Sequence, residues 1–237
     1  MDKPAKHARP RPYVTVYSEV SADGKTTHRR GASSKPMMDL EDEDIRRYRH
    51  ALRAEAHAIM VGSGTLRLDD PSLTVRHVRG RNPLRVIVSA DGDLPLTSRV
   101  FTDGQPTLVA LGRDATEDRI DALRATGAQI EVTDTRTVNL PMLLERLRDR
   151  DVATLIVEGG ATLLASFFRL HLVDKLIVQH LPVIFGGSAT PSMVGGPPLR
   201  DPRGGHPLRL VEVKRVGAHA VIVYECLHEE DPPWDAS

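Results

Sequence analysis

The chain has 237 residues, of which 40% are hydrophobic, and its 32 basic and 32 acidic side chains cancel in charge. The apolar fraction is sufficient for a packed core, whereas the balanced charge argues against broad affinity for nucleic acid. The one cysteine, Cys226, excludes an internal disulfide framework and the Cys-x-x-Cys pair of a zinc nucleoside deaminase.

No apolar run approaches the roughly 20 residues that span a bilayer, and the first residues lack the apolar core of a secretory signal. We therefore expect a cytoplasmic protein with neither a membrane nor a nucleic acid as partner. The ten histidines show no metal-ligand spacing, so no metal site is predicted.

The first part of the chain predicts a strand over 13–20, a turn at Gly24 and a polar loop over 25–38. A helix is expected to begin at Asp39, because acidic residues fill its first turn and apolar residues then recur at helical spacing (Ile45, Tyr48, Leu52).

Short apolar runs with turn residues at their ends predict strands over 58–61, 84–88, 107–111, 129–132 and 153–157. Helices are expected between the later strands, over 116–126, after the N-cap residue Asn139, and over 161–170.

The C-terminal part predicts a long apolar strand over 175–184 and a hairpin of 208–216 with 219–227 around Gly217. Between them lies 186–207, where 11 of 22 residues are Gly or Pro. Irregular segments of this length are usually functional covers or disordered.

This order of elements is typical of an α/β fold with a mostly parallel central sheet, helices on both faces and an antiparallel C-terminal hairpin. We expect one domain over residues 11–228, a disordered or extended N-terminal tail over 1–10 and an acidic tail over 229–237.

Ligands of open α/β sheets bind beyond the carboxyl ends of the strands, and three predicted strand ends carry unusual residues. The segment 62–71 (GSGTLRLDDP) has two glycines that allow close backbone approach, followed by paired carboxylates. Alternatively, it is a tight turn with a helix stop. The third end, 89–92 (SADG), has the composition of an ordinary turn.

The segment 157–163 (VEGGATL) ends a strand, turns on two glycines and opens a helix. Such a turn offers free N–H groups and a positive helix end to a diphosphate. Alternatively, Glu158 only caps the helix. No GxGxxG fingerprint occurs in the chain, and Ser63 lacks the pattern of a nucleophile elbow.

Six ordered segments give the chain a family resemblance that covers about Arg11 to Leu227. It resembles the pyrimidine reductase of riboflavin biosynthesis, which occurs alone or fused behind a pyrimidine deaminase and has a dihydrofolate-reductase-like fold. The deaminase part is missing, so the chain looks like the stand-alone form. The segments are SADGK (21–25), LRA (52–54), VGSGTLRLDDPSLTVR (61–76), NPLRV (82–86), VEGGATL (157–163) and LVDKLIVQHLPVIFGG (172–187).

The resemblance implies a reaction, a cofactor and a set of binding residues. The family reduces a phosphoribosylamino-pyrimidine with NADPH, and a hydride goes to C1′ of the ribose. Residues 160–166 match the stretch that holds the cofactor diphosphate, and Thr65 and Asp69 match positions near the nicotinamide. The full set expected to bind cofactor is Gly62, Gly64, Thr65, Asp69, Ala90, Asp91, Gly159, Gly160, Ala161, Thr162 and Leu163.

The resemblance also implies substrate contacts from Ser33, Arg53, Leu73, Arg76 and Glu158. Ser33 is a looser match, because residues 31–45 form a longer loop than is usual in the family. Ser34-Lys35-Pro36 stands where the family often has a tryptophan.

Reduction of an opened ribosylamine is fastest when the imine nitrogen is protonated, so the site needs a general acid near C1′. Lys25, Asp69 and Glu158 are the candidate catalytic residues, and we expect both carboxylates at loop ends near solvent. Forked donors from Arg53 and Arg76 suit the ribose 5′-phosphate.

The turn at 89–93 raises the question of which cofactor is used, because Asp91 and Asp93 stand where the family often has basic residues. A carboxylate repels a 2′-phosphate and accepts hydrogen bonds from a 2′-hydroxyl. We predict NADPH with a weakened preference, NADH being the alternative. Arg85 is a further candidate for the phosphate contact.

Several alternatives stay open at this point. The substrate is a diaminopyrimidinone or an aminouracil. The same fold could serve another pyrimidine or pterin nucleoside in a secondary pathway, or bind nucleotides without turnover. The resemblance implies a homodimer, whose interface we expect on the strand over 175–184 and the terminal hairpin.

Overall fold

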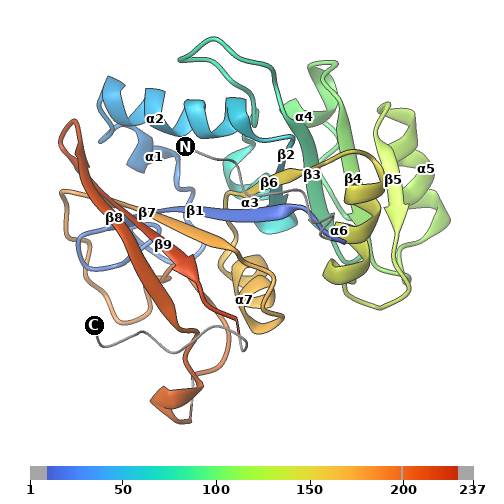
Figure 1. The fold of residues 1–237 in the computed structure, drawn as a ribbon. Helices are drawn as coiled ribbons and strands as arrows, with labels where there is room; N and C mark the ends of the chain where they lie inside the picture. The colour runs from blue at the N-terminus through green and yellow to red at the C-terminus, as the bar shows by residue number, and fades with distance from the viewer. Residues whose placement is uncertain (1–9, 199, 229–237) are drawn as a thin grey trace.

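The computed structural model describes residues 10–198 and 200–228 (Figure 1). Its strands are β1 (Tyr13–Ser21), β2 (Ala58–Gly62), β3 (Leu84–Ser89), β4 (Thr107–Leu111), β5 (Gln129–Val132), β6 (Thr154–Val157), β7 (Lys175–Leu181), β8 (Leu208–Val216) and β9 (His219–Cys226). They form one sheet in the order β5-β4-β3-β2-β6-β1-β7-β9-β8. All pairs from β5 to β7 are parallel, and β9 and β8 form the antiparallel edge. The predicted fold class is confirmed.

Helices cover both faces of this sheet, and Figure 1 shows α2 and α7 on opposite sides of β1. The leucines of α6 and the phenylalanines of α7 pack on one face, whereas α2, α3 and α5 pack on the other. The helices are α1 (Lys35–Met38), α2 (Glu43–Glu55), α3 (Ser63–Asp69), α4 (Arg99–Thr102), α5 (Glu117–Ala125), α6 (Leu140–Asp149), α7 (Ala161–Arg169) and the 3-10 turn η1 (Pro202–Gly204).

The burial of each strand follows from its place in the sheet. Every residue of β4 is buried, because helices cover both faces of this parallel strand. By contrast, β8 lies at the sheet edge, where Leu210, Val211 and Val213 are 57–61% exposed.

Most predicted strands and helices lie within one residue of their expected bounds. The helix expected from Asp39 is an exception, since α2 begins at Glu43. The Oδ1 of Asp42 accepts a hydrogen bond of 3.0 Å from the N–H of Ile45, which makes Asp42 the N-cap. The loop expected over 25–38 also contains the short helix α1, with Pro36 in its first turn.

Two further expectations were wrong. The strand expected to reach residue 184 ends at Leu181, because Pro182 has no N–H to donate to the ladder. The glycine-containing segment after β2 is the helix α3 rather than a loop. The short helix α4 was not predicted.

Of the predicted tails, only Pro10 falls among the described residues. Within the described part of the chain, no helix combines the length and the apolar character needed to cross a membrane.

Candidate active site

A cavity of about 330 Å³ lies at the carboxyl ends of β1, β2 and β6. Here β6 is inserted between β1 and β2, so strands that are distant in sequence end side by side. The C-terminal half of β1 contributes Tyr17, Ser18 and Glu19 to the cavity wall, and Glu158 follows β6 directly. Two of the three predicted strand ends, those after β2 and β6, therefore meet at this cavity.

The turn between β6 and α7 brings backbone close to the cavity. Gly159 and Gly160 have φ angles of 119° and 93°, which L side chains rarely adopt. A Cβ on Gly160 would lie 3.4 Å from the Oγ1 of Thr65, so the turn packs closely against α3. No side chain caps the first turn of α7, whose Ala161 and Thr162 line the cavity. This helix end suits an anionic group.

Other residues expected to bind cofactor surround this turn. Gly64 lines the cavity and has open space around the position of a Cβ. Gly62 and Leu163 do not line it. A Cβ on Gly62 would lie 3.7 Å from that of Leu163, so these two residues mark the contact between the start of α3 and the first turn of α7.

Arg53 and Glu158 form an ion pair on the cavity wall. The Nε of Arg53 donates to Oε1 at 2.7 Å and its Nη2 donates to Oε2 at 2.5 Å. The carbonyl of Thr74 accepts a third hydrogen bond from Nη1 at 3.1 Å. The two side chains are only 5% and 9% exposed, so the expectation that Glu158 lies near solvent was wrong.

Asp69, the last residue of α3, ties the loop of α1 to the cavity. Its Oδ1 accepts hydrogen bonds from the Oγ of Ser33 at 2.7 Å and the N–H of Ser34 at 2.8 Å. Its Oδ2 accepts from the Oγ of Ser34 at 2.8 Å. Asp69 is 8% exposed, so it too is buried rather than near solvent. Ser34 lines the cavity, whereas Ser33 lies behind it.

The loop between α3 and β3 carries two of the residues expected to bind substrate. Leu73 lines the cavity, is 1% exposed and has a φ of 55°, a backbone conformation that surrounding contacts must hold in place. Arg76 is exposed and lies outside the cavity wall, where its Nη1 donates to the Oγ1 of Thr74 at 3.0 Å. Among the described residues, the side-chain hydrogen bond of Arg76 goes to this hydroxyl and not to a carboxylate.

Lys25 is not brought to the cavity wall. Its Nζ lies 3.5 Å from the carbonyl of Thr190, and its backbone pairs with Ser192. The same loop places Pro191 and Met193 on the wall, so part of the Gly- and Pro-rich segment covers the cavity.

The turn after β3 also lies outside the cavity wall, with Ala90 and Asp91 exposed. Its neighbours include two cations: Arg67 donates to the carbonyl of Asp93 at 2.5 Å and Arg119 to that of Asp91 at 3.1 Å. Arg85 cannot reach this turn, because it is 1% exposed and paired with Asp103 at the opposite end of β3.

A buried polar network that was not predicted from the sequence lies beside the cavity. The Nη1 and Nη2 of Arg49 donate to the two oxygens of Glu41 at 2.7 and 2.8 Å, and Nη1 also contacts Oε1 of Glu19. Gln179 donates to Glu41 at 3.2 Å and accepts from the hydroxyl of Tyr17. Burial, together with the charge of Glu19, raises the pKa of Glu41 to about 7. Burial also raises the pKa of Tyr17.

A signal for this network was present in the sequence. Ile45, Arg49 and Arg53 recur every four residues, which places both guanidinium groups on the apolar face of α2. Buried guanidinium groups require carboxylate partners, so the pattern could have directed a search for Glu41 and Glu158.

The comparisons with known proteins agree on one family. The model of the RibD C-terminal domain matches residues 12–222. The 2,5-diamino-6-ribosylamino-4(3H)-pyrimidinone 5′-phosphate reductase of Aquifex aeolicus is 44% identical over 187 residues, covering 78% of this chain and 84% of its own length. The reductase of the same name from Methanothermobacter thermautotrophicus is 36% identical over 217 residues, 90% and 98% of the two chains. RibD of Acinetobacter baumannii superposes with a TM-score of 0.78 at 22% identity, over 93% of this chain and 60% of its own.

Proposed function

The chain belongs to the RibD C-terminal domain family, and we propose that it is the reductase that converts 2,5-diamino-6-ribosylamino-4(3H)-pyrimidinone 5′-phosphate to its ribitylamino form in riboflavin biosynthesis. The observation that carries this proposal is one cavity lined by two kinds of group. These are a glycine turn at a helix end and a set of buried ion-paired side chains. The first suits a dinucleotide, and the second suits a polar substrate.

Reductases of this family use a nicotinamide cofactor, and the residues present fit one. The turn at Gly159 and Gly160 packs on Thr65, and Ala161 and Thr162 at the uncapped start of α7 line the cavity. We propose that the amides at this helix start hold the cofactor diphosphate and that Thr65 lies near the nicotinamide. Bound in this way, the reduced nicotinamide would supply the hydride for C1′ of the ribose.

The protein side chains contribute a proton and an orientation. Opening the ribosylamine ring moves the N–H proton to the ring oxygen and leaves a C1′=N bond. Hydride then adds to C1′, and one further proton reaches the nitrogen. Glu158 and Asp69 are the proposed proton carriers on the cavity wall, and Arg53 fixes the orientation of Glu158. Lys25 would reach C1′ only if the covering loop moved, since its ammonium group contacts Thr190.

Arg76 is the proposed partner of the substrate phosphate. It lies exposed on the loop that carries Leu73, and its side-chain hydrogen bond within the described chain goes to a hydroxyl rather than a carboxylate. A charge-assisted contact to phosphate would therefore displace no carboxylate and compete only with solvent and the hydroxyl of Thr74.

For the cofactor, we propose NADPH with NADH as a slower alternative. Asp91 disfavours a 2′-phosphate, while Arg67 and Arg119 beside the same turn favour it. The ratio of kcat/KM for the two cofactors tests this, since Asp91→Lys should shift it toward NADPH. An unchanged ratio would mean that the turn does not contact the 2′ position.

We also propose a homodimer formed through the edge strand β8. Its exposed apolar residues Leu210, Val211 and Val213 lie beside unpaired backbone groups of the sheet edge. The strand β7, also expected at the interface, pairs on both sides and lies inside the sheet. Light scattering should show a dimer for wild type and a monomer for Val213→Lys.

The decisive test of the function is oxidation of NADPH, followed by absorbance, with two separate substrates. These are the diaminopyrimidinone nucleotide and its deaminated counterpart, 5-amino-6-(5-phosphoribosylamino)uracil. Reduction of the first with formation of the ribitylamino product is expected. If neither nucleotide is reduced, the proposed function is wrong.

A further inference from the structure

We propose that Glu19 determines substrate specificity by accepting a hydrogen bond from the 2-amino group of the pyrimidine. This inference rests on the proposed function and adds the residue that distinguishes the diaminopyrimidinone from the aminouracil.

One oxygen of the Glu19 carboxylate remains available to a ligand. Oε1 contacts Nη1 of Arg49, whereas Oε2 has no hydrogen-bond partner among the described residues. The side chain lies on the cavity wall and is 16% exposed. It is therefore largely desolvated and already fixed in direction by Arg49.

The cations nearest to Glu19 already have carboxylate partners. Arg49 is shared with Glu41, which takes two of its N–H groups and also lies 4.0 Å from the Nε of Arg46. Arg53, the next cation on this face of α2, is paired with Glu158. The Oε2 atom of Glu19 therefore remains an acceptor on the cavity wall.

The carboxylate of Glu19 limits which part of a ligand can bind beside it. A phosphate would be repelled, and the helix end of α7 and Arg76 offer better places for the anionic parts of both ligands. Apolar side chains of Met38 and Leu73 on the same cavity suit a flat ring. The neutral pyrimidine, with its amino groups, is the part of the substrate that complements Glu19.

The two candidate substrates differ at C2 of this ring. The diaminopyrimidinone has an amino group there, which donates to a carboxylate, whereas the aminouracil has a carbonyl oxygen, which a carboxylate repels. A buried acceptor that faces the wrong group is left without a partner, and such mismatches give strong discrimination.

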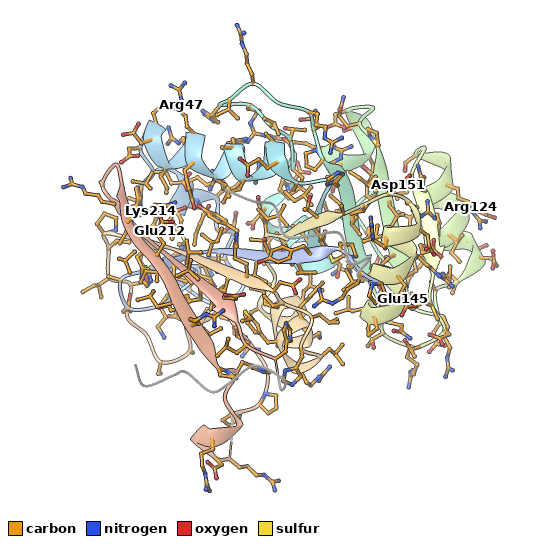
Figure 2. The ribbon with its side chains drawn as sticks, viewed as in Figure 1. Arg47, Arg124, Glu145, Asp151, Glu212 and Lys214 are labelled. Carbon is orange, nitrogen blue, oxygen red and sulfur yellow. The ribbon has the colours of Figure 1, made fainter. Side chains whose placement is uncertain are left out.

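The experiment compares kcat/KM for the two nucleotides in wild type and in Glu19→Gln. Gln has nearly the same shape, and its amide N–H group can donate a hydrogen bond to a carbonyl oxygen. Wild type should prefer the diaminopyrimidinone nucleotide by about 10- to 100-fold or more, and Glu19→Gln should reduce this preference by at least about tenfold. The control is Glu145→Gln, the same change on the exposed surface of α6 (Figure 2), which should keep the wild-type preference.

Calorimetric binding of the same two nucleotides separates this inference from the proposed function. If neither nucleotide is turned over, the proposed function fails. The role of Glu19 is then decided by binding: wild type should bind the diaminopyrimidinone nucleotide more tightly than the aminouracil nucleotide, and Glu19→Gln should reduce that preference. Equal losses for both nucleotides would overturn the inference, because Glu19 would then only hold Arg49 or contact the ribose. Unchanged preference in Glu19→Gln would overturn it as well.

Discussion

Replacing Glu158 with Gln should lower both turnover and stability, because this carboxylate is one half of a buried ion pair. Removing one partner of such a pair leaves a desolvated charge and typically costs about 3–5 kcal/mol. Gln keeps one acceptor for Arg53, and Thr74 keeps its own contact, so we expect a cost just below this range, about 2–3 kcal/mol. In a chain of this size that cost lowers Tm by roughly 5–10 °C.

Turnover of Glu158→Gln should fall by about 100-fold, the usual scale for a positioned proton carrier. Calorimetry and the NADPH assay measure the two effects separately, with Glu145→Gln as the surface control. Adding Arg53→Met should recover about half of the lost stability, because no buried charge is then left unpaired, and should not recover activity. A Tm within about 2 °C of wild type in Glu158→Gln would refute the assignment of this pair as stabilising.

Three further substitutions test the remaining parts of the site. Asp69→Asn should lower turnover by about 100-fold and loosen the loop bonded to it, seen as faster proteolysis near α1; wild-type turnover would exclude a catalytic role. Arg76→Ala should weaken calorimetric binding of the phosphorylated nucleotide by about 1.5–3 kcal/mol more than that of its dephosphorylated form, and equal weakening would mean that Arg76 only shapes its loop. Glu41, whose pKa rises from 4.5 to about 7 on folding, favours the folded state below pH 4.5 and loses this contribution as the pH rises through 7. The unfolding free energy of wild type should therefore fall between pH 4.5 and 8, and in Glu41→Gln this fall should be smaller by up to about 3 kcal/mol. The same dependence of unfolding free energy on pH in both proteins would contradict the shifted pKa.

The strands and the glycine turn could be predicted because their causes are local. Apolar runs bounded by turn residues mark parallel strands covered on both faces, and Gly159-Gly160 before a helical segment marks backbone with positive φ. The start of α2 was misplaced because Asp39 and Asp42 are both plausible caps. Only the hydrogen bond from Ile45 distinguishes them.

The details of the site could not be predicted because they depend on contacts between distant segments. Lys25 was placed correctly after β1, but its direction is set by the segment at 190–192 that pairs with it. Glu19 lies in an apolar strand, where alternation alone suggests an outward-facing residue. Its orientation toward the cavity follows from Arg49, which the helix presents to the sheet.

The groups that line the cavity suggest why the reaction belongs at the carboxyl ends of β1, β2 and β6. Gly160 and Thr65 offer uncharged donors, whereas Glu19 and Glu158 offer carboxylates. Each carboxylate is already held by a guanidinium group, so little side-chain freedom remains to be lost when substrate binds. A protonated C1′=N bond carries positive charge, and carboxylates fixed in a desolvated site stabilise that charge more than water does. The ion pairs of Glu19 and Glu158 cost desolvation energy when the chain folds. They also favour the protonated C1′=N bond, which is the state to which a hydride adds fastest.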